Sequence, residues 1–356
     1  MLTGLAHRLA LALPPMFAHR LAVGILALGV PVAWRDLSGP AVTAAGLGFA
    51  NPIGLAAGFD KDARALPGLV RMGFGHVEIG TVTPRPQAGN PGRALFRLAE
   101  DRAIVNRLGM PGDGAEIVAA RLERWRSRNP GHPVRIGISV GANRDSRDIA
   151  GDMAFGVGRL GPLADYLTVN LSSPNTQGLR DWQSGERLSR VLEAVREARG
   201  RLANRPPLFV KIAADMERDA EADLVERAVA AGIAGLVLCN TTLDRPPTLK
   251  SPHAWRPGGL SGAPLTERGL GQLQRVHALG RGRLALIASG GVMSAEDALA
   301  RLDAGAALVQ VMTGWIYRGP RLVDEIATAL AARGRQPVRP GSPRSTVPLQ
   351  PDPARP

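Results

Sequence analysis

The stretch Tyr166-Leu-Thr-Val-Asn-Leu-Ser-Ser-Pro-Asn-Thr176 is the segment from which the fold of this chain can be read. Its first six residues predict a buried strand, and its last five place amides and hydroxyls around Pro174, which fixes a turn. Two interpretations are open at this point. The polar residues either form a turn between a strand and a helix, or they hydrogen-bond a small polar ligand.

Strand-like segments of this kind alternate with helix-like segments after Pro40. The expected strands are 51–58, 76–82, 135–140, 166–171, 208–213, 235–240, 284–288 and 308–312. The expected helices are 63–72, 113–126, 148–160, 186–203, 218–231, 266–279, 295–303 and 320–333. Two short strands are expected in addition, near 96–98 and 104–107. Eight alternating units predict an α/β fold, the (β/α)8 TIM barrel, rather than a doubly wound sheet, which usually has fewer strands.

A barrel collects its functional groups at the C-terminal ends of the strands, and this chain places polar residues there repeatedly. They are Lys61, Thr81, Asn170, Ser173, Lys211, Asn240, Thr241, Ser289 and Thr313. Gly290-Gly291 and Thr313-Gly314 follow the last two expected strands, where barrels often bind phosphate through backbone N–H groups. We therefore interpret the opening stretch as part of a site and expect a phosphorylated cofactor.

The composition narrows the class of protein. The 356 residues are 45% hydrophobic, and a net charge of +13 indicates a solvated basic surface first, a membrane surface second and nucleic acid third. The single cysteine excludes a disulfide framework and a cysteine-rich metal site. Only three of the 44 basic residues are lysines, so Lys61 and Lys211, at the ends of expected strands, are better site candidates than the scattered arginines.

The two ends of the chain differ from the barrel. Residues 1–40 predict a basic, apolar helical hairpin broken at Pro14-Pro15, which either packs on the barrel or lies in a membrane interface. A signal peptide is disfavoured, because no clean cleavage site follows the apolar segment. We expect the barrel to span 41–333 and a disordered, proline- and arginine-rich tail to span 334–356. No apolar run reaches the roughly 18 residues of a membrane span.

Five blocks in this order resemble dihydroorotate dehydrogenase of the quinone-dependent, membrane-associated class, over about residues 15–333. They are Gly54-Leu-Ala-Ala-Gly-Phe-Asp-Lys61, Glu78-Ile-Gly-Thr-Val-Thr-Pro-Arg-Pro-Gln87, Asn170-Leu-Ser-Ser-Pro-Asn-Thr176 with Gly178-Leu-Arg180, Asn240-Thr-Thr-Leu-Asp-Arg245 and Gly258-Gly-Leu-Ser-Gly262. The resemblance implies that dihydroorotate is oxidised to orotate through FMN, with a membrane quinone as the electron acceptor, in pyrimidine biosynthesis.

The resemblance also implies roles for individual residues. Ser173 matches the catalytic base, which a relay through Thr176 would activate. The matching substrate positions are Lys61, Asn106, Arg107, Leu108, Gly109, Met110, Asn170, Asn175, Asn240 and Thr241. The matching FMN positions are Ala57, Gly58, Phe59, Asp60, Lys61, Thr81, Ser139, Asn170, Lys211, Cys239, Gly262, Gly291, Met312 and Thr313. His19 and Arg97 match the path of the quinone, and no metal is expected.

The implied protein is a peripheral protein on the cytoplasmic side of the cell membrane and a monomer, with no nucleic-acid partner. The sequence departs from the family pattern at Met110-Pro-Gly112, Ser139, Ala142 and Cys239. Two alternatives are weighed against this interpretation. A tRNA dihydrouridine synthase would need a catalytic cysteine and an RNA-binding extension, and neither is apparent. A membrane-bound phosphate-ligand binder without activity would not turn over the substrate.

Overall fold

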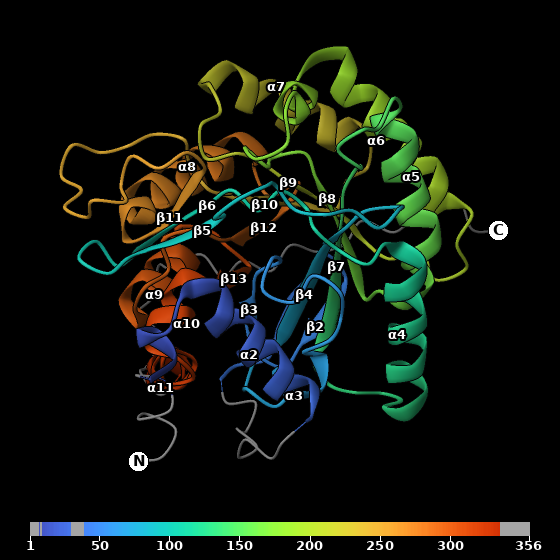
Figure 1. Cartoon of the computed structure of the whole chain (residues 1–356). Coiled ribbons are helices and arrows are strands. Elements are labelled where there is room, and N and C mark those ends of the chain that lie inside the picture. Colours follow the sequence, from blue (N-terminus) through green and yellow to red (C-terminus); the bar gives the residue numbers. More distant parts are fainter. Residues whose placement is uncertain (1–6, 8, 30–38, 335–356) are drawn as a thin grey trace.

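The computed structural model describes residues 7, 9–29 and 39–334, and eight parallel strands in this part of the chain close into a barrel (Figure 1). The strands are β3 (Ile53–Leu55), β4 (His76–Val82), β7 (Arg135–Val140), β8 (Tyr166–Asn170), β9 (Leu208–Lys211), β10 (Gly235–Leu238), β12 (Ala285–Ala288) and β13 (Leu308–Val311). The barrel closes where Val309 of β13 pairs with Ile53 of β3. The predicted TIM barrel and its eight strands are thereby confirmed.

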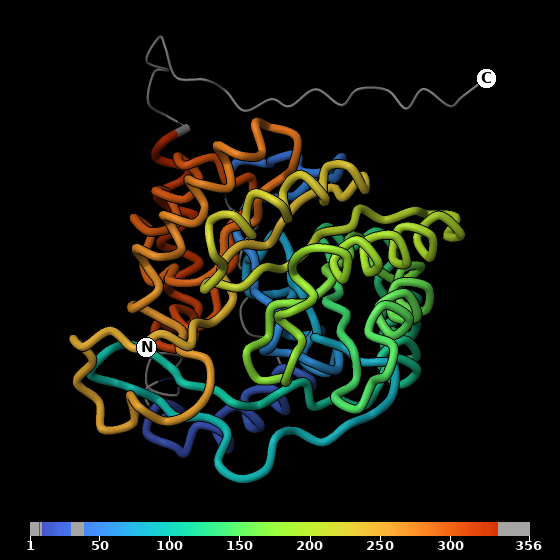
Figure 2. Tube along the Cα trace, turned by 90° about the horizontal axis from the view of Figure 1, so that it is seen from above, coloured from blue at the N-terminus to red at the C-terminus, as the bar shows by residue number. Residues whose placement is uncertain are grey.

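Helices surround the barrel (Figures 1 and 2). Those between consecutive strands are α3 (Leu66–Leu69), α4 (Ala115–Arg128), α5 (Ile149–Leu160), α6 (Gly185–Gly200), α7 (Arg218–Ala230), α8 (Thr266–Gly280) and α9 (Ala295–Asp303), and the last strand is followed by α10 (Thr313–Arg318) and α11 (Arg321–Gly334). Local capping explains where two of them begin. The Asp148 carboxylate accepts from the N–H of Gly151 before α5, and the Ser294 hydroxyl accepts from the N–H of Asp297 before α9.

Three elements lie beyond the predicted pattern. The hairpin of β1 (Val42–Ala44) and β2 (Leu47–Phe49) precedes the barrel, and the short helix α10 directly follows its last strand. The expected short strands are confirmed as β5 (Leu95–Leu98) and β6 (Ala103–Asn106), but β11 (Gly259–Gly262) pairs with β6 to complete a three-stranded sheet. Glycines and a polar residue make up most of β11, so its sequence carries little strand propensity.

The barrel interior is apolar toward the N-terminal ends of the strands and polar closer to their C-terminal ends. Tyr166 and Phe209 pack there with Phe49 of the β1–β2 hairpin. Glu78 is buried above them, and its Oε2 accepts from the hydroxyls of Tyr166 and Thr168 and from the Gln310 amide. This layer closes the bottom of the barrel, so a ligand can enter only at the C-terminal ends of the strands.

The N-terminal region packs against one side of the barrel. Residues 9–12 are helical, and α2 (Pro15–Ala27) follows after Pro14. Leu26 of α2 packs closely against Gly68 of α3. A Cβ added at Gly68 would lie 2.7 Å from the Leu26 side chain. Figure 2 shows this helix in dark blue at the edge of the molecule. Within the described residues, no helix has the length and apolarity to cross a membrane.

Four large apolar side chains of the N-terminal region point outward: Leu9, Phe17, Leu21 and Ile25 are exposed, together with Leu28 just after α2. These residues form what we call the apolar face of the hairpin. The expected tail, beyond Gly334, and residues 30–38 lie outside the described residues.

Candidate active site

A large cavity opens at the C-terminal ends of the barrel strands, with an empty volume of about 1300 Å³ including open solvent at its mouth. Its lining residues follow β3, β4, β8, β9, β10, β12 and β13, and others come from the β5–β6–β11 sheet and from α2. The lining combines amides, hydroxyls, two lysines and backbone groups, which can orient a polar ligand.

The end of β8 carries a continuous chain of hydrogen bonds across the floor of this cavity. The Asn170 amide donates to the Thr81 hydroxyl (2.7 Å), which also bonds Ser139 (3.0 Å). The Ser172 hydroxyl donates to Asn170 Oδ1 (2.8 Å) and accepts from the Asn240 amide (2.8 Å). Residues on β4, β7 and β8 are thereby linked to the loop that follows β10, and Ser172 acts inside this chain rather than toward the cavity.

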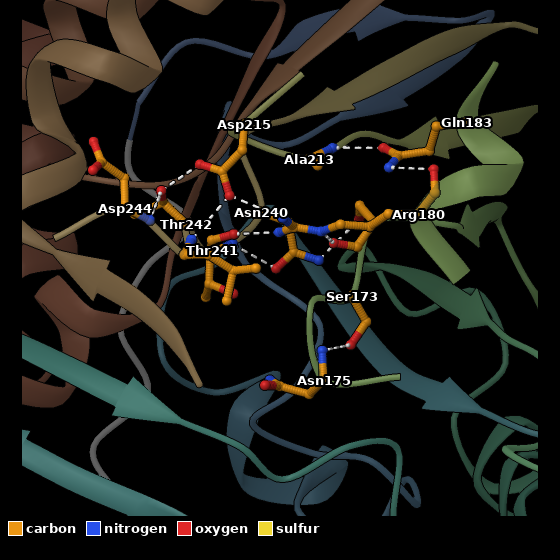
Figure 3. Close-up of polar contacts among 12 residues, drawn as sticks. Ser173, Asn175, Arg180, Gln183, Ala213, Asp215, Asn240, Thr241, Thr242 and Asp244 are labelled. Atoms are coloured by element: carbon orange, nitrogen blue, oxygen red, sulfur yellow. Dashed lines mark hydrogen bonds and ion pairs between the residues drawn. The ribbon is translucent and has the colours of Figure 1, made fainter. Parts of the chain in front are cut away.

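Ser173 faces the cavity instead. It is 7% exposed, and its Oγ accepts the backbone N–H of Asn175 at 3.3 Å (Figure 3). No hydrogen bond joins Thr176 to Ser173 within the described part of the chain, so the expected relay is not formed in this arrangement. The opening stretch of the sequence is thus divided by its fold: one serine is structural, and the next presents its hydroxyl to a ligand.

A second group of amides approaches from the β5–β6–β11 sheet. The Asn175 side chain donates to Asn106 Oδ1 at 3.0 Å, and Asn106 is the last residue of β6. The Asn90 amide donates to the Asn175 carbonyl at 3.1 Å. Asn106, Asn170, Asn175 and Asn240 all line the cavity, which gives it several neutral donors and acceptors for a flat polar ligand.

Two buried lysines supply the positive charge of the cavity. Burial, opposed by Asp62 and Asp60, lowers the pKa of Lys61 to about 8, and its Nζ donates to the Gly58 carbonyl at 2.7 Å. Burial also lowers the pKa of Lys211, against the attraction of Glu78. The Lys211 ammonium donates no hydrogen bond to any described residue, so it is available to a bound group.

Backbone N–H groups after β12 and β13 form a cradle on one wall of the cavity. Among the described residues, the N–H groups of Gly291, Val292, Thr313 and Gly314 have no hydrogen-bond acceptor. Gly291 has φ +70°, and a Cβ there would lie 2.4 Å from the backbone nitrogen of Thr266. Unpaired donors around a glycine turn are what a phosphate requires, so these residues fit a phosphorylated cofactor.

Most predicted site residues line this cavity, and four do not. Arg107 and Asp60 lie outside the lining; the Asp60 carboxylate accepts from the N–H groups of Arg64 and Ala65, and burial raises its pKa to about 6. Ser139 is fully buried and reaches the site only through Thr81. The Arg97 guanidinium donates to the carbonyls of Leu11 and Leu13.

Arg97 therefore ties the hairpin to the β5–β6–β11 sheet, while His19 lines the cavity. The His19 ring packs edge-on against Phe59 at 5.2 Å, and burial together with Lys61 lowers the pKa of His19 to about 4. The imidazole is thus neutral at pH 7. Ser261 lies within the Gly258–Gly262 block without a predicted role, yet it lines the cavity and bonds Thr313 at 2.8 Å.

Two departures from the family pattern have a structural account. Met110 is buried in the cavity lining. Its sulfur would lie 2.8 Å from a Cβ added at Gly141, so the two residues are in close contact. Cys239 has φ +68°, and burial raises its pKa to about 12, so its thiol is neutral and unreactive. The described residues contain no cluster of His, Cys, Asp and Glu that could hold a metal ion.

The chain is similar to known proteins of one family. The family model described as "Dihydroorotate dehydrogenase" matches residues 40–333. Among similar curated proteins are a dihydroorotate dehydrogenase (quinone) of Rhodospirillum rubrum, 45% identical over 93% of this chain and 90% of its own, and one of Cereibacter sphaeroides, 47% identical over 89% of each. A crystal structure of an Eimeria tenella DHODH in complex with ferulenol superposes with a TM-score of 0.86 at 38% identity, covering 90% of this chain and 91% of that one.

Proposed function

Because this chain belongs to the dihydroorotate dehydrogenase family, and its relatives are of the quinone-dependent class, we propose a role for each group at the barrel mouth. The reaction is the oxidation of dihydroorotate to orotate, with a quinone as the electron acceptor, in pyrimidine biosynthesis. The observation that carries the assignment of the site is the buried hydroxyl of Ser173, which faces the cavity between two lysines and four asparagines.

The flavin that this chain binds, in this proposal, is FMN. The unpaired N–H groups of Gly291, Val292, Thr313 and Gly314 would hold its phosphate, and the free ammonium of Lys211 would face its ring. The rest of the wall consists of the other predicted flavin positions that line the cavity: Ala57, Gly58, Phe59, Thr81, Asn170, Cys239, Gly262 and Met312. When bound, the flavin supplies hydride acceptance from the substrate and electron transfer to the quinone.

The substrate lies against Lys61 and the asparagine amides. A protonated Lys61 attracts the carboxylate of dihydroorotate, and Asn106, Asn175 and Asn240 offer hydrogen bonds to the edges of the pyrimidine. Leu108, Gly109 and Met110 close one side of the cavity and exclude water. Thr241 and Asn170 are the remaining predicted substrate-binding residues in the cavity lining. Arg107 lies outside the lining and acts on the segment 108–110 that follows it.

Ser173 takes the proton from C5 of dihydroorotate while a hydride leaves C6, so that the C5–C6 double bond forms, and Ser173 gives up its own hydroxyl proton. A serine hydroxyl is a weak base in water, and the N–H of Asn175, which donates to Ser173 Oγ, favours the negative charge that Oγ develops as its own proton departs. Burial excludes competing water from the same point. The proton then leaves through Thr176, whose hydroxyl must turn toward Ser173 once the substrate is bound.

The hairpin delivers the quinone. The neutral ring of His19 lies in the cavity wall beside Phe59, Arg97 holds the turn between the two helical segments, and the apolar face offers contact with acyl chains. Residues 1–40 thus form a membrane-binding unit and 41–333 the catalytic barrel. The protein is a monomer bound peripherally to the cytoplasmic side of the cell membrane.

The decisive experiment replaces Ser173 with alanine. Loss of a general base costs about 10²–10⁴-fold in rate, so we expect turnover of dihydroorotate to fall by about 1,000-fold while the flavin absorbance of the purified protein stays unchanged. Ser173→Cys, which keeps a proton acceptor, retains part of the activity. Ser127→Ala, an exposed serine on α4, serves as the control. Full turnover by Ser173→Ala would exclude this serine as the base.

The electron acceptor is tested in the same assay. We expect a ubiquinone analogue to support turnover and fumarate and NAD to support little, because the apolar face leads to the cavity through His19. Equal rates with NAD would contradict the proposed quinone path.

A further inference from the structure

Arg180 contacts three different loops at the barrel mouth, although it does not line the cavity. Its Nε donates to the carbonyl of Ser172 at 3.1 Å, and its Nη2 donates to the carbonyl of Thr241 at 2.8 Å. Its Nη1 donates to the Asp215 carboxylate at 2.9 Å. One guanidinium therefore joins the loops that follow β8, β9 and β10 (Figure 3).

Asp215 anchors the other side of this contact. Its carboxylate accepts from the hydroxyl of Thr242, from the N–H of Leu243 (2.9 Å) and from Arg268 (3.3 Å). Burial alone would raise the pKa of Asp215, but the hydrogen bonds from Thr242, Leu243 and Arg180 outweigh it and hold the pKa below its usual value. The carboxylate stays charged at neutral pH and keeps its partner Arg180 in place.

The segment that carries Arg180 is itself braced. The Gln183 amide donates to the carbonyl of Arg180 at 3.3 Å, and Gln183 Oε1 accepts from the N–H of Ala213 at 2.8 Å, just beyond the end of β9 (Figure 3). Gln183 thus ties the backbone of Arg180 to the residues that follow β9.

The two carbonyls that Arg180 binds are adjacent to reacting groups. The carbonyl of Ser172 belongs to the peptide bond that leads into Ser173, and Thr241 follows Asn240, whose amide bonds Ser172. A planar guanidinium with several donors fixes directions as well as distances. Loss of these bonds would let both loops shift, and a displacement of about 1 Å costs about 100-fold in rate.

We propose that Arg180 and Asp215 form a positioning pair that fixes the Ser173 loop and the Asn240-Thr241 loop relative to each other for proton abstraction. This inference rests on the proposed role of Ser173 as the base. Neither residue touches the substrate, so both act through the backbone that they hold.

The chain offers a matched control at the opposite end of the same strand. Arg126 donates to the carbonyl of Leu163 at 3.0 Å and to Asp165 at 2.7 Å, just before β8 begins. The exposed fractions of the side chains are 28% and 14% for Arg126 and Asp165, against 20% and 23% for Arg180 and Asp215. Arg126→Gln therefore removes a similar set of bonds, at the far end of the barrel from the cavity.

The test compares Arg180→Gln and Arg126→Gln by rapid-mixing flavin reduction over a range of dihydroorotate concentrations without quinone. For Arg180→Gln we expect the limiting rate of reduction to fall about 100-fold, the apparent Kd for dihydroorotate to change less than about fivefold, and the isotope effect from C5 deuteration to rise as proton transfer becomes slower. For Arg126→Gln we expect a lower melting temperature but a rate of reduction within about twofold of the wild type.

Arg180→Lys keeps the charge but only part of the hydrogen bonding, so an intermediate rate is expected, and this variant serves as the test if Arg180→Gln does not fold. Asp215→Asn combined with Arg180→Gln should lose little more than Arg180→Gln alone, because the two residues act as one unit. A wild-type rate for Arg180→Gln or Arg180→Lys, or an equal loss in Arg126→Gln, would overturn the positioning role. If the wild-type protein fails to reduce its flavin with dihydroorotate, the proposed function fails instead.

Discussion

At the scale of single residues, the rarity of lysine in this chain proved informative. Both lysines predicted from their positions at strand ends line the cavity, and burial lowers the pKa of each. A compact ammonium can be desolvated beside a ligand and can lose its proton in an accessible pH range, which a guanidinium cannot. Arg180 and Arg97 instead hold backbone carbonyls.

The pKa of Lys61, about 8, predicts how activity depends on pH. Below pH 8 the ammonium is charged and attracts the substrate carboxylate, and above it the neutral amine does not. We therefore expect kcat/KM for dihydroorotate to fall about tenfold per pH unit above pH 8. The pH profile of kcat/KM measures this directly.

Lys61→Gln should have a low kcat/KM that no longer changes with pH in this range. The control is Lys250→Gln, which changes an exposed lysine whose backbone N–H bonds Asp101. A profile that stays flat to pH 10 in the wild type would refute the assignment.

At the scale of elements, the hairpin formed by residues 9–12 and α2 has two different faces. Ala18 and Leu26 are buried on the barrel side, while Phe17, Leu21 and Ile25 are exposed. An exposed apolar stripe on a helix too short to span a bilayer is typical of an interfacial element. Phe17, Leu21 and Ile25 do not line the cavity, so the proposed roles of the apolar face and of Ser173 can be tested by separate mutations.

Deleting residues 1–35 should leave reduction of the flavin by dihydroorotate within about threefold of the wild type and lower turnover with a ubiquinone analogue more than about tenfold. The physical reason is that the deletion removes His19 and the apolar face but none of the residues around Ser173. Stopped-flow absorbance measures the first rate, and steady-state assays measure the second.

A water-soluble dye as electron acceptor provides the control, since it does not need the hairpin. The double variant Phe17→Ser, Ile25→Ser keeps α2 and should weaken binding to phospholipid vesicles. Unchanged quinone kinetics after the deletion would contradict the proposed role of the hairpin.

At the scale of the whole molecule, the barrel depends on close contact between strands whose side chains fill its interior. Gly54 of β3 faces the ring of His76, and a Cβ at Gly54 would lie 2.0 Å from it. His76 cannot move away easily, because it packs against Phe49 and Tyr166. The closed barrel therefore leaves no room for a side chain at position 54.

Gly54→Ala should lower the free energy of unfolding by about 2–3 kcal/mol, because overpacking a closed core forces backbone shifts. Gly48→Ala, in β2, is the control: no atom lies within 4 Å of the added Cβ, so a change within about 0.5 kcal/mol is expected. Urea denaturation followed by circular dichroism compares the two variants. Equal stabilities would show that the barrel relaxes around the added methyl group.

The sequence by itself determined the barrel and the identity of most groups at its mouth. Each strand is a short apolar run followed by polar residues, as in 166–176. The local sequence therefore indicates both the strand and the strand end that carries the functional side chains. The same local signal placed Lys61, Lys211 and Ser173 at strand ends, and all three line the cavity.

Only the tertiary structure decided which of these groups meet. The strand β11 exists because it pairs with β6, more than 150 positions away, and Gly259 lies so close to Thr241 that a Cβ would meet its Oγ1 at 2.0 Å. Likewise Asp60, within a matching motif, and Ser139, at a predicted flavin position, do not line the cavity, whereas Arg180 reaches Ser172 and Thr241 from outside it. Hydrogen bonds between distant segments form only after the barrel closes, so no local pattern of residues can specify them.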